Sequence, residues 1–273
     1  MSMNLSVLMS VYDKESSAYL YRSLDSLANQ TFQADEIVLV EDGPLGQELS
    51  AVIGRFQKSM LIKRVKLPVN GGLGGALQMG LTACRGEYVA RMDSDDVSVP
   101  DRFHVQMDFL QNHPEVDVLG ATIAEFRDDC ADATRTRRMP SSGELILEFA
   151  KSRNPINHQT VVFRKASVLA VGGYQPFNGF EDYDLWARML KVGFRLQNMN
   201  AVLVYARCGN GMQGRRGGLA YIKREVAFMF HLRNEGFLSN FQCTRNILSR
   251  TMVRFLPNFA RDLFYSRFLR RRQ

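Results

Sequence analysis

The feature that most limits how this chain can fold is the alternation of short apolar runs with helix-length segments up to residue 122. Apolar or alternating runs typical of strands cover 5–11, 36–42, 62–67, 87–92 and 116–122. Segments with helical spacing of their apolar residues lie between them, at 19–29, 47–58, 72–82 and 100–112. Strands that alternate with helices predict right-handed crossovers, and therefore an α/β fold with a mostly parallel sheet flanked by helices.

The regular alternation of strand-like and helix-like segments ends after residue 122. The polar segment 125–140 predicts a loop or an excursion at the edge of the sheet, 158–166 a strand, and 181–193 an amphipathic helix. Beyond residue 209 a stretch rich in glycine and arginine predicts a link to a helical C-terminal part. We therefore expect a main domain over 1–208, in two halves (1–122 and 123–208), and a helical, basic amphipathic region over 209–273.

The net charge of +7 comes from the end of the chain. Residues 240–273 contain eight arginines and one acidic residue, Asp262, whereas the rest is balanced. Arginines interleaved with phenylalanine and leucine predict peripheral contact of residues 245–273 with an anionic membrane. Docking of these aromatics on the main domain, or nucleic-acid binding, are the alternatives. The balanced main domain offers no extended basic groove, so we expect no nucleic-acid partner.

The chain has no apolar run of the roughly 20 residues that cross a bilayer. Its N-terminus lacks the basic region and the small-residue cleavage site of a signal peptide. Its four cysteines are isolated, which excludes a zinc-finger pattern and a disulfide framework. We therefore expect a cytoplasmic protein that lies peripherally on the inner face of the cytoplasmic membrane.

Acidic residues follow two of the predicted strands. Glu41 and Asp42 follow the second strand, and Asp93, Asp95 and Asp96 follow the fourth. Ligands of open α/β sheets bind beyond the carboxyl ends of the strands, where these side chains should meet. Carboxylate oxygens suit a hard cation such as Mg²⁺ or Mn²⁺. The alternative is that these acids only cap the following helix.

Four motifs, in order, resemble the family 2 glycosyltransferases of GT-A fold, over residues 4–205. They are "LSVLMSVYDKE", "QTFQADEIVLVEDGP", "NGGLGGALQMGLTACRGEYVARMDSDDVSVPDR" and "NGFEDYDLWARML". The chain resembles in particular bacterial exopolysaccharide and surface-polysaccharide enzymes of the amylovoran type. It departs from the family pattern at Glu41, where an aspartate is usual, and in "GGALQMG", which lacks an arginine that contacts phosphate in relatives.

The resemblance implies a set of donor-binding residues. Asp42 would accept a hydrogen bond from the nucleobase, Asp93 would lie near the ribose, and Asp95 would bind the metal most directly. Asp93 and Asp95 together would be the metal ligands, with Asp96 supporting them. The full set is Val11, Tyr12, Glu41, Asp42, Asn70, Gly71, Asp93, Ser94, Asp95, Arg102 and His158.

For two residues of that set we expect a particular contact. Arg102 should pair with a carboxylate. His158, with Asn157, should hydrogen-bond the donor sugar; a satisfied core histidine is the alternative.

On the acceptor side, the resemblance implies that Asp182 is the catalytic base and that Glu181 assists it. A carboxylate opposite the diphosphate suits deprotonation of an acceptor hydroxyl. Capping of the helix that begins at Glu181 is the alternative.

The function that the resemblance implies is an inverting, Mn²⁺- or Mg²⁺-dependent hexosyl transfer. The donor would be a nucleotide-diphospho-sugar, by default a UDP-sugar, and the acceptor a saccharide, lipid-linked, in surface-polysaccharide assembly. A nucleotidyltransferase is one alternative, although "VYDKES" after the first strand is not the glycine- and lysine-rich phosphate loop it needs. A catalytically silent scaffold at the membrane is the other.

Overall fold

The computed structural model describes residues 4–133, 135–208, 219–255 and 271–272. The strands are β1 (Leu5–Val11), β2 (Glu36–Glu41), β3 (Ile62–Lys66), β4 (Tyr88–Asp93), β5 (Val97–Ser98), β6 (Val118–Phe126), β7 (Arg135–Arg137), β8 (Val162–Arg164), β9 (Leu196–Arg207) and β10 (Arg271–Arg272). The helices are α1 (Ser17–Ala28), α2 (Gln47–Phe56), α3 (Leu73–Ala83), α4 (Arg102–Asn112), α5 (Gly143–Ala150), α6 (Lys165–Ala170), α7 (Glu181–Lys191), α9 (Leu219–Asn234) and α10 (Asn240–Phe255).

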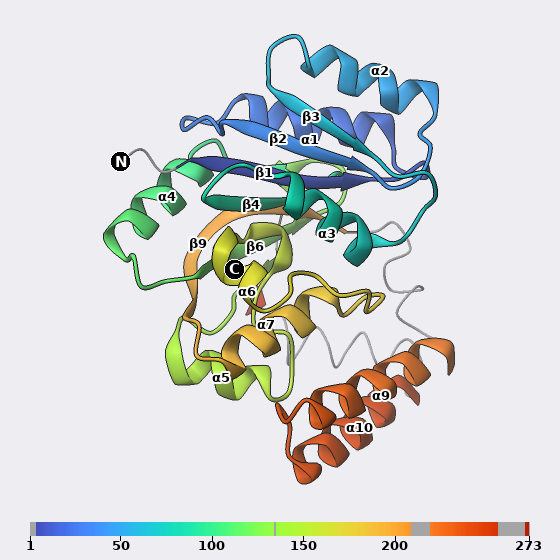
Figure 1. Cartoon of the computed structure of the whole chain (residues 1–273), viewed down its shortest axis with the longest axis vertical. Helices are drawn as coiled ribbons and strands as arrows, with labels where there is room; N and C mark the ends of the chain where they lie inside the picture. Colours follow the sequence, from blue (N-terminus) through green and yellow to red (C-terminus); the bar gives the residue numbers. More distant parts are fainter. Residues whose placement is uncertain (1–3, 134, 209–218, 256–270, 273) are drawn as a thin grey trace.

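The strands form one twisted sheet with helices around it (Figure 1). Its order is β10-β7-β6-β8-β4-β1-β2-β3, and β9 pairs with β6 and β5. The half made of β3, β2, β1 and β4 is parallel, as the sequence predicts. Beyond β4 the pairings of β8, β6 and β7 are antiparallel, while β9 runs parallel to β6.

Two apolar layers cover the two faces of the sheet. On β1, Leu5, Val7 and Met9 face the layer that contains α1, α2 and α4, whereas Leu8 faces the layer that contains α3 and α7. Both faces are buried, which explains why the parallel strands are continuous apolar runs. Residues at the carboxyl ends of these strands consequently lie at a rim with helices on either side.

The predicted elements of the first 122 residues are confirmed, with ends shifted by one to four residues. The prediction of a loop over 125–140 is wrong in part, because β6 continues to Phe126 and β7 lies at 135–137. The sequence analysis also did not identify α5 or β9. In the C-terminal part the helices α9 and α10 confirm the predicted pattern, but Arg271–Arg272 pair with β7 as a strand.

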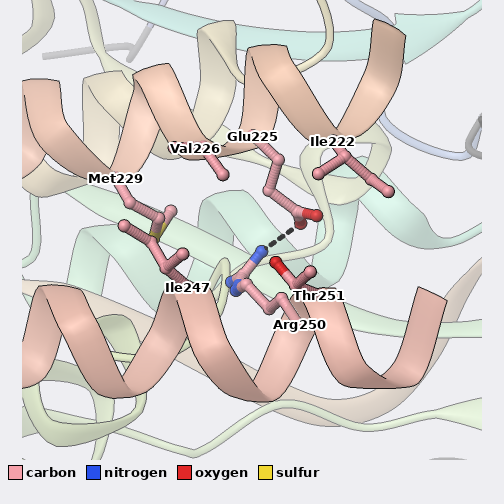
Figure 2. Close-up of a pocket in the computed structure, with 7 residues that line it drawn as sticks. All are labelled: Ile222, Glu225, Val226, Met229, Ile247, Arg250 and Thr251. Atoms are coloured by element: carbon pink, nitrogen blue, oxygen red, sulfur yellow. Dashed lines mark hydrogen bonds and ion pairs between the residues drawn. The ribbon is translucent and has the colours of Figure 1, made fainter. Parts of the chain in front are cut away.

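The helices α9 and α10 lie side by side and pack on the main domain (Figure 1). Phe228 of α9 stacks on Phe180, and His231 pairs with Asp184 of α7 at 2.8 Å. Arg250 pairs with Glu225 between the two helices at 2.5 Å and donates to the Ser152 carbonyl (Figure 2). The space between the side chains there is too small for a water molecule.

Asn246 and Arg250 of α10 thus contact the main domain, whereas the aromatic side chains of the docking alternative, at 255–268, lie outside what the structure describes, so that alternative stays a prediction. No helix in the described ranges has the length and apolarity needed to span a bilayer.

Candidate active site

The carboxyl ends of three parallel strands meet at one edge of the sheet. In the strand register Val11 of β1 is level with Glu41 of β2, and Ser10 is level with Asp93 of β4. The peptide N–H of Asp42 donates to the Val11 carbonyl at 2.8 Å, which joins the first two loops. The acidic residues that the sequence places after separate strands are thus brought to one edge.

Asp93, Asp95 and Asp96 form a cluster of carboxylates at this edge. One oxygen from each lies within 4.8 Å of the others. Burial, then the neighbouring Asp93 and Glu15, raise the pKa of Asp95 to about 7. Burial, with Asp93 and Asp95, raises the pKa of Asp96 well above its usual value. The protein therefore holds negative charge here at a cost that a cation would relieve.

The cluster has a built-in cation, the guanidinium of Arg91. Arg91 is 3% exposed on β4, and its Nη2 forms an ion pair with Asp93 Oδ1. Burial disfavours its charge, but Asp93 outweighs burial, so the pKa of Arg91 is raised. The same guanidinium lowers the pKa of Glu181, although burial leaves that pKa raised overall. Arg91 therefore acts on both the acidic loop after β4 and the turn that carries the candidate base.

The residues expected to bind the nucleotide differ in burial and in their hydrogen-bond partners. The carboxylate of Asp42 is 5% exposed and accepts the backbone N–H groups of Gly71 and Gly72 at 2.7 and 3.1 Å. The Asn70 amide donates to the Asp42 carbonyl at 3.1 Å, which ties the third loop to the second. Val11 is buried and Tyr12 is half-buried.

Glu41, the departure from the family pattern, is 4% exposed and bound by Arg64 of β3 at 2.5 Å. Its carboxylate charge is therefore offset within the sheet.

The expectation that Arg102 pairs with a carboxylate is wrong for the contacts that the structure describes. Arg102 is fully buried and donates to the carbonyl of Arg91 at 2.9 Å and to Gln106 Oε1 at 3.0 Å. Burial, then the charge of Arg91, lowers its pKa to about 9. Arg102 is a core residue that joins α4 to β4, and the proximity of arginine to the acidic motif in sequence did not show which side it faces.

His158 follows the alternative of a satisfied core histidine. It is 7% exposed, and its Nε2 lies 2.9 Å from the hydroxyl of Tyr174. Burial, then Arg91, lowers its pKa well below the usual value, so the ring is neutral. Asn157 is fully buried and donates to the carbonyls of Ala121 and Arg137. We therefore leave both out of the donor site.

The candidate base lies in the first turn of α7. Asp182 Oδ2 accepts the side-chain amide of Asn154 at 2.5 Å, and Oδ1 accepts the N–H of Tyr183 at 2.8 Å. Glu181 is buried and accepts the N–H of Gly179 at 2.7 Å. Burial, then Asp182, raises the pKa of Glu181.

The capping alternative for α7 keeps support, because Asp182 accepts the N–H of Tyr183 and the first turn contains three acidic residues. The N-cap residue of α7 is Phe180, which makes no side-chain cap hydrogen bond.

The turn of α7 is close to the loop that holds Asp42. A Cβ on Gly74, in the first turn of α3, would lie 2.6 Å from the Gln175 carbonyl and 3.2 Å from Glu181 Cβ. Glycine at this position therefore allows α3 to approach the loop before α7. The structure thus brings Asn70, Gly71 and the Glu181–Asp182 turn to one edge.

Several residues at the edge were not identified from the sequence. Arg91 had a detectable signal, because a charge in a buried strand needs a partner, but the others lack one. Asn154 lies 28 residues before Asp182, and Arg207 lies more than a hundred residues after Asp96. The residues missed are Glu15, Ser23, Arg91, Asn154 and Arg207.

Comparison with known proteins agrees with this architecture. The model of the family described as "Glycosyl transferase family 2" matches residues 6–170. The chain is 41% identical to the amylovoran biosynthesis glycosyltransferase AmsE of Erwinia amylovora, over 96% of this chain and 98% of that protein. It is 35% identical to the UDP-Gal:alpha-D-GlcNAc-diphosphoundecaprenol beta-1,3-galactosyltransferase of Escherichia coli, over 97% and 96% of the two chains.

Among solved structures, residues 1–349 of S. aureus TarS in complex with UDP-GlcNAc resemble this fold. The TM-score is 0.68 at 19% identity, over 97% of this chain and 75% of that one. Fold and acidic edge together define a transferase of the GT-A fold. The chain belongs to glycosyl transferase family 2.

Proposed function

We propose that this glycosyltransferase moves a sugar, with inversion, from a nucleotide-diphosphate donor to a lipid-linked saccharide in bacterial surface-polysaccharide biosynthesis. The observation that carries the proposal is the meeting of two acidic groups at one edge of the sheet: the cluster after β4 and the turn that begins α7. The names of the two relatives, amylovoran biosynthesis and transfer to a diphosphoundecaprenol-linked sugar, support this choice.

In the proposed donor site, the nucleotide is bound by the loops that follow β1, β2 and β3. Val11 and Tyr12 line the base, with Asp42 as its hydrogen-bond partner. The loop at 70–71 faces the diphosphate, where its backbone N–H groups suit anionic oxygens. The Gly71 N–H donates to Asp42 in this structure. A bound nucleotide would therefore contact two residues that already hydrogen-bond to each other. The UDP-sugar default is supported by the name of the galactosyltransferase relative.

The carboxylate cluster fits a divalent cation. Asp96 Oδ2 is buried and has no hydrogen-bond partner among the described residues, and burial, then the charges of Asp93 and Glu15, raises the pKa of Asp95. Asp93 and Asp95 would hold Mn²⁺ or Mg²⁺ with oxygen ligands. A bound ion would offset the charge on the departing diphosphate.

Asp182 supplies the base on the acceptor side. Its carboxylate is half-buried and oriented by the Asn154 amide and the Tyr183 N–H. It takes the proton of the acceptor hydroxyl while the hydroxyl oxygen bonds to the anomeric carbon and the nucleoside diphosphate leaves from the opposite face. Glu181 lies beside that carboxylate, and burial, then Asp182, raises its pKa.

A lipid-linked acceptor requires the enzyme to work at a membrane. On α10, Phe241 is 74% exposed and Leu248 is 58% exposed, and the exposed Arg245 lies between them at helical spacing. This apolar and basic stripe suits the interface of an anionic bilayer. The stripe lies on a hairpin that is docked on α7, so membrane contact and docking are compatible.

The first test is the base. Asp182→Asn should retain donor affinity and lose transfer by about 10²-fold or more, the scale for removal of a general base. Turnover of a UDP-sugar with a diphosphoprenyl-linked saccharide is the measurement, and Asp108→Asn, on the exposed side of α4, is the control. Unchanged turnover in Asp182→Asn would move the base elsewhere.

The released product distinguishes a glycosyltransferase from the two alternatives, a nucleotidyltransferase and a silent scaffold. A glycosyltransferase releases a nucleoside diphosphate, whereas a nucleotidyltransferase releases pyrophosphate. A silent scaffold releases neither under any combination of UDP-, TDP- or GDP-sugar with Mn²⁺.

A further inference from the structure

The loop after β4 is held in place by three other segments of the chain. From α1, the Ser23 hydroxyl donates to the Asp93 carbonyl at 2.9 Å. From the loop after β1, Glu15 accepts the hydroxyl of Ser94 at 2.6 Å. The third segment is the end of β9, where Arg207 contacts the next two residues of the loop.

Arg207 contacts both Asp95 and Asp96. Its peptide N–H donates to Asp96 Oδ1 at 2.8 Å, and its side-chain Nε donates to the Asp95 carbonyl at 3.1 Å. Its Nη1 donates to the carbonyl of Arg127 at 2.7 Å. The residue is 4% exposed. One residue therefore fixes the backbone of one carboxylate residue and the side chain of the next.

The guanidinium of Arg207 has little freedom to turn. Its Cζ lies 3.8 Å from the centre of the Tyr19 ring and 4.5 Å from that of Phe126. A planar cation stacked on aromatic rings is both attracted and oriented by them. Pairing of Tyr205 with Val97 anchors β9 to β5, next to the loop. The position of Arg207 is therefore set by elements that do not belong to the loop.

These contacts decide which oxygen of Asp96 is left for a ligand. Oδ1 is taken by the Arg207 N–H, while Oδ2 is buried without a partner among the described residues. Asp96 contributes an oxygen to the same cluster as Asp93 and Asp95.

We propose that Arg207 is a positioning residue that fixes Asp95 and Asp96, so that Asp96 adds a third carboxylate to the site for the divalent cation. This inference rests on the proposed function, because it assigns residues to the metal site of that function. Arg207 itself does not touch the ion: it acts through the Asp95 carbonyl and the Asp96 carboxylate.

Two measurements on the full chain test the proposal, with Mn²⁺ as the probe. Arg207→Met should weaken Mn²⁺ binding about 10- to 100-fold, the range for residues that orient metal ligands. Electron paramagnetic resonance of free Mn²⁺ gives this affinity. In metal-free protein, hydrogen exchange of the peptide 92–99 should become several-fold faster, because the loop loses the bond from the Arg207 side chain to the Asp95 carbonyl, while the peptide N–H of residue 207 still reaches Asp96.

Arg22→Met is the matched control. Arg22 also lies over Phe126 and donates to a carbonyl of the same neighbouring loop, that of Asp128, at 2.8 Å. Wild-type behaviour of Arg22→Met, with the two losses in Arg207→Met, supports the proposal. Equal losses in both variants would overturn it, because they would reflect general loosening around Phe126.

Further variants keep the proposal testable. Arg207→Lys retains the charge without the planar group, and should show a smaller loss in the same direction if Arg207→Met fails to fold. Asp96→Asn should weaken Mn²⁺ binding, and the double variant with Arg207→Met should be weaker by less than the product of the two single effects. Wild-type Mn²⁺ affinity in either single variant overturns the proposal.

A failure of the proposed function would give a different experimental result from a failure of the role of Arg207. If the wild type binds no Mn²⁺, the metal-dependent function fails. Hydrogen exchange then decides on Arg207 alone, and unchanged exchange in Arg207→Met overturns its positioning role.

Discussion

At the scale of single residues, the site depends on one buried cation among several acids. Arg91 pairs with Asp93 and acts on Asp95, Asp96 and Glu181, whose pKa values would rise further without it. Burial of a charge is costly unless partners offset it, and here the partners are the acids of the site. The fold therefore already contains one cation beside these acids, to which the proposed metal would be added.

Arg91→Met should lower the free energy of unfolding by about 2–4 kcal/mol, because it leaves several acids without their buried counter-charge. The matched control is Arg64→Met, which removes the partner of one acid, Glu41, and should cost about 1 kcal/mol. Urea denaturation in EDTA measures both. A loss in Arg91→Met no larger than in the control would show that the acids do not need this guanidinium.

The carboxylate cluster predicts an unusual dependence of stability on pH. The pKa of Asp95 is raised to about 7, above its unfolded value near 4, so its contribution is fully present below about pH 4 and is lost as pH rises through 7. Stabilisation by Mn²⁺ should grow over the same interval, because the metal binds the ionised form.

Thermal unfolding from pH 5 to pH 8, with Mn²⁺ or with EDTA, checks this prediction. In EDTA at pH 8, Asp95→Asn should be more stable than the wild type and should gain little from Mn²⁺. Equal stability of the two proteins at pH 8 in EDTA would contradict it.

At the scale of elements, the contact of α3 with the loop before α7 joins the two halves of the site. Gly74 and Gly75 are adjacent on α3, but a Cβ at Gly74 would meet the Gln175 carbonyl at 2.6 Å, whereas a Cβ at Gly75 would meet nothing within 4 Å. Alanine at Gly75 therefore tests helix propensity alone, whereas alanine at Gly74 also tests the packing of α3 against the Gln175 carbonyl.

Gly74→Ala should destabilise the protein by about 1–3 kcal/mol and lower transfer, because it pushes the Asp182 turn away from the donor loop. Gly75→Ala should stabilise it by about 0.5–1 kcal/mol and leave transfer unchanged. Denaturation curves and turnover of both variants are the measurement. Lower transfer in both would mean that α3 acts in some way other than by this close approach.

Much of the fold follows from local patterns, and less of the site does. The strands at 5–11, 36–42 and 87–92 are largely apolar because helices cover both faces, and 62–67 alternates, so periodicity and turns reveal all four. β9 begins with the mixed sequence "LQNMNA" and carries no such signal. The acids at strand ends were found by their positions, whereas the contact of Arg207 with Asp96 depends on a pairing across 111 residues.

At the scale of the whole molecule, the helical hairpin of α9 and α10 has one side packed on the main domain and another that carries the stripe proposed to contact the membrane. One side contacts α7 through Phe228 and His231, near the turn with the candidate base. On α10, the stripe of Phe241, Arg245 and Leu248 is exposed. The proposed membrane stripe and the candidate base are therefore connected through one hairpin and α7.

The double substitution Phe241→Ser with Leu248→Ser should weaken binding to phosphatidylglycerol–phosphatidylcholine vesicles about tenfold or more, because two apolar side chains no longer enter the interface. Vesicle sedimentation at low and high salt is the measurement, and binding should fall with salt. Leu145→Ser, on α5, removes a leucine that is 65% exposed elsewhere and is the control. Unchanged vesicle binding in the double variant would place the membrane contact outside this stripe.

The strand β9 has a consequence for the order in which the enzyme matures. During synthesis, the acids of the loop after β4 emerge long before the strand whose Arg207 holds two of them. A nascent chain that ends before β9 contains all three carboxylates and the candidate base but not this last brace. The contacts that Arg207 makes with Asp95 and Asp96 can therefore form only after nearly all of residues 1–208 have been synthesised.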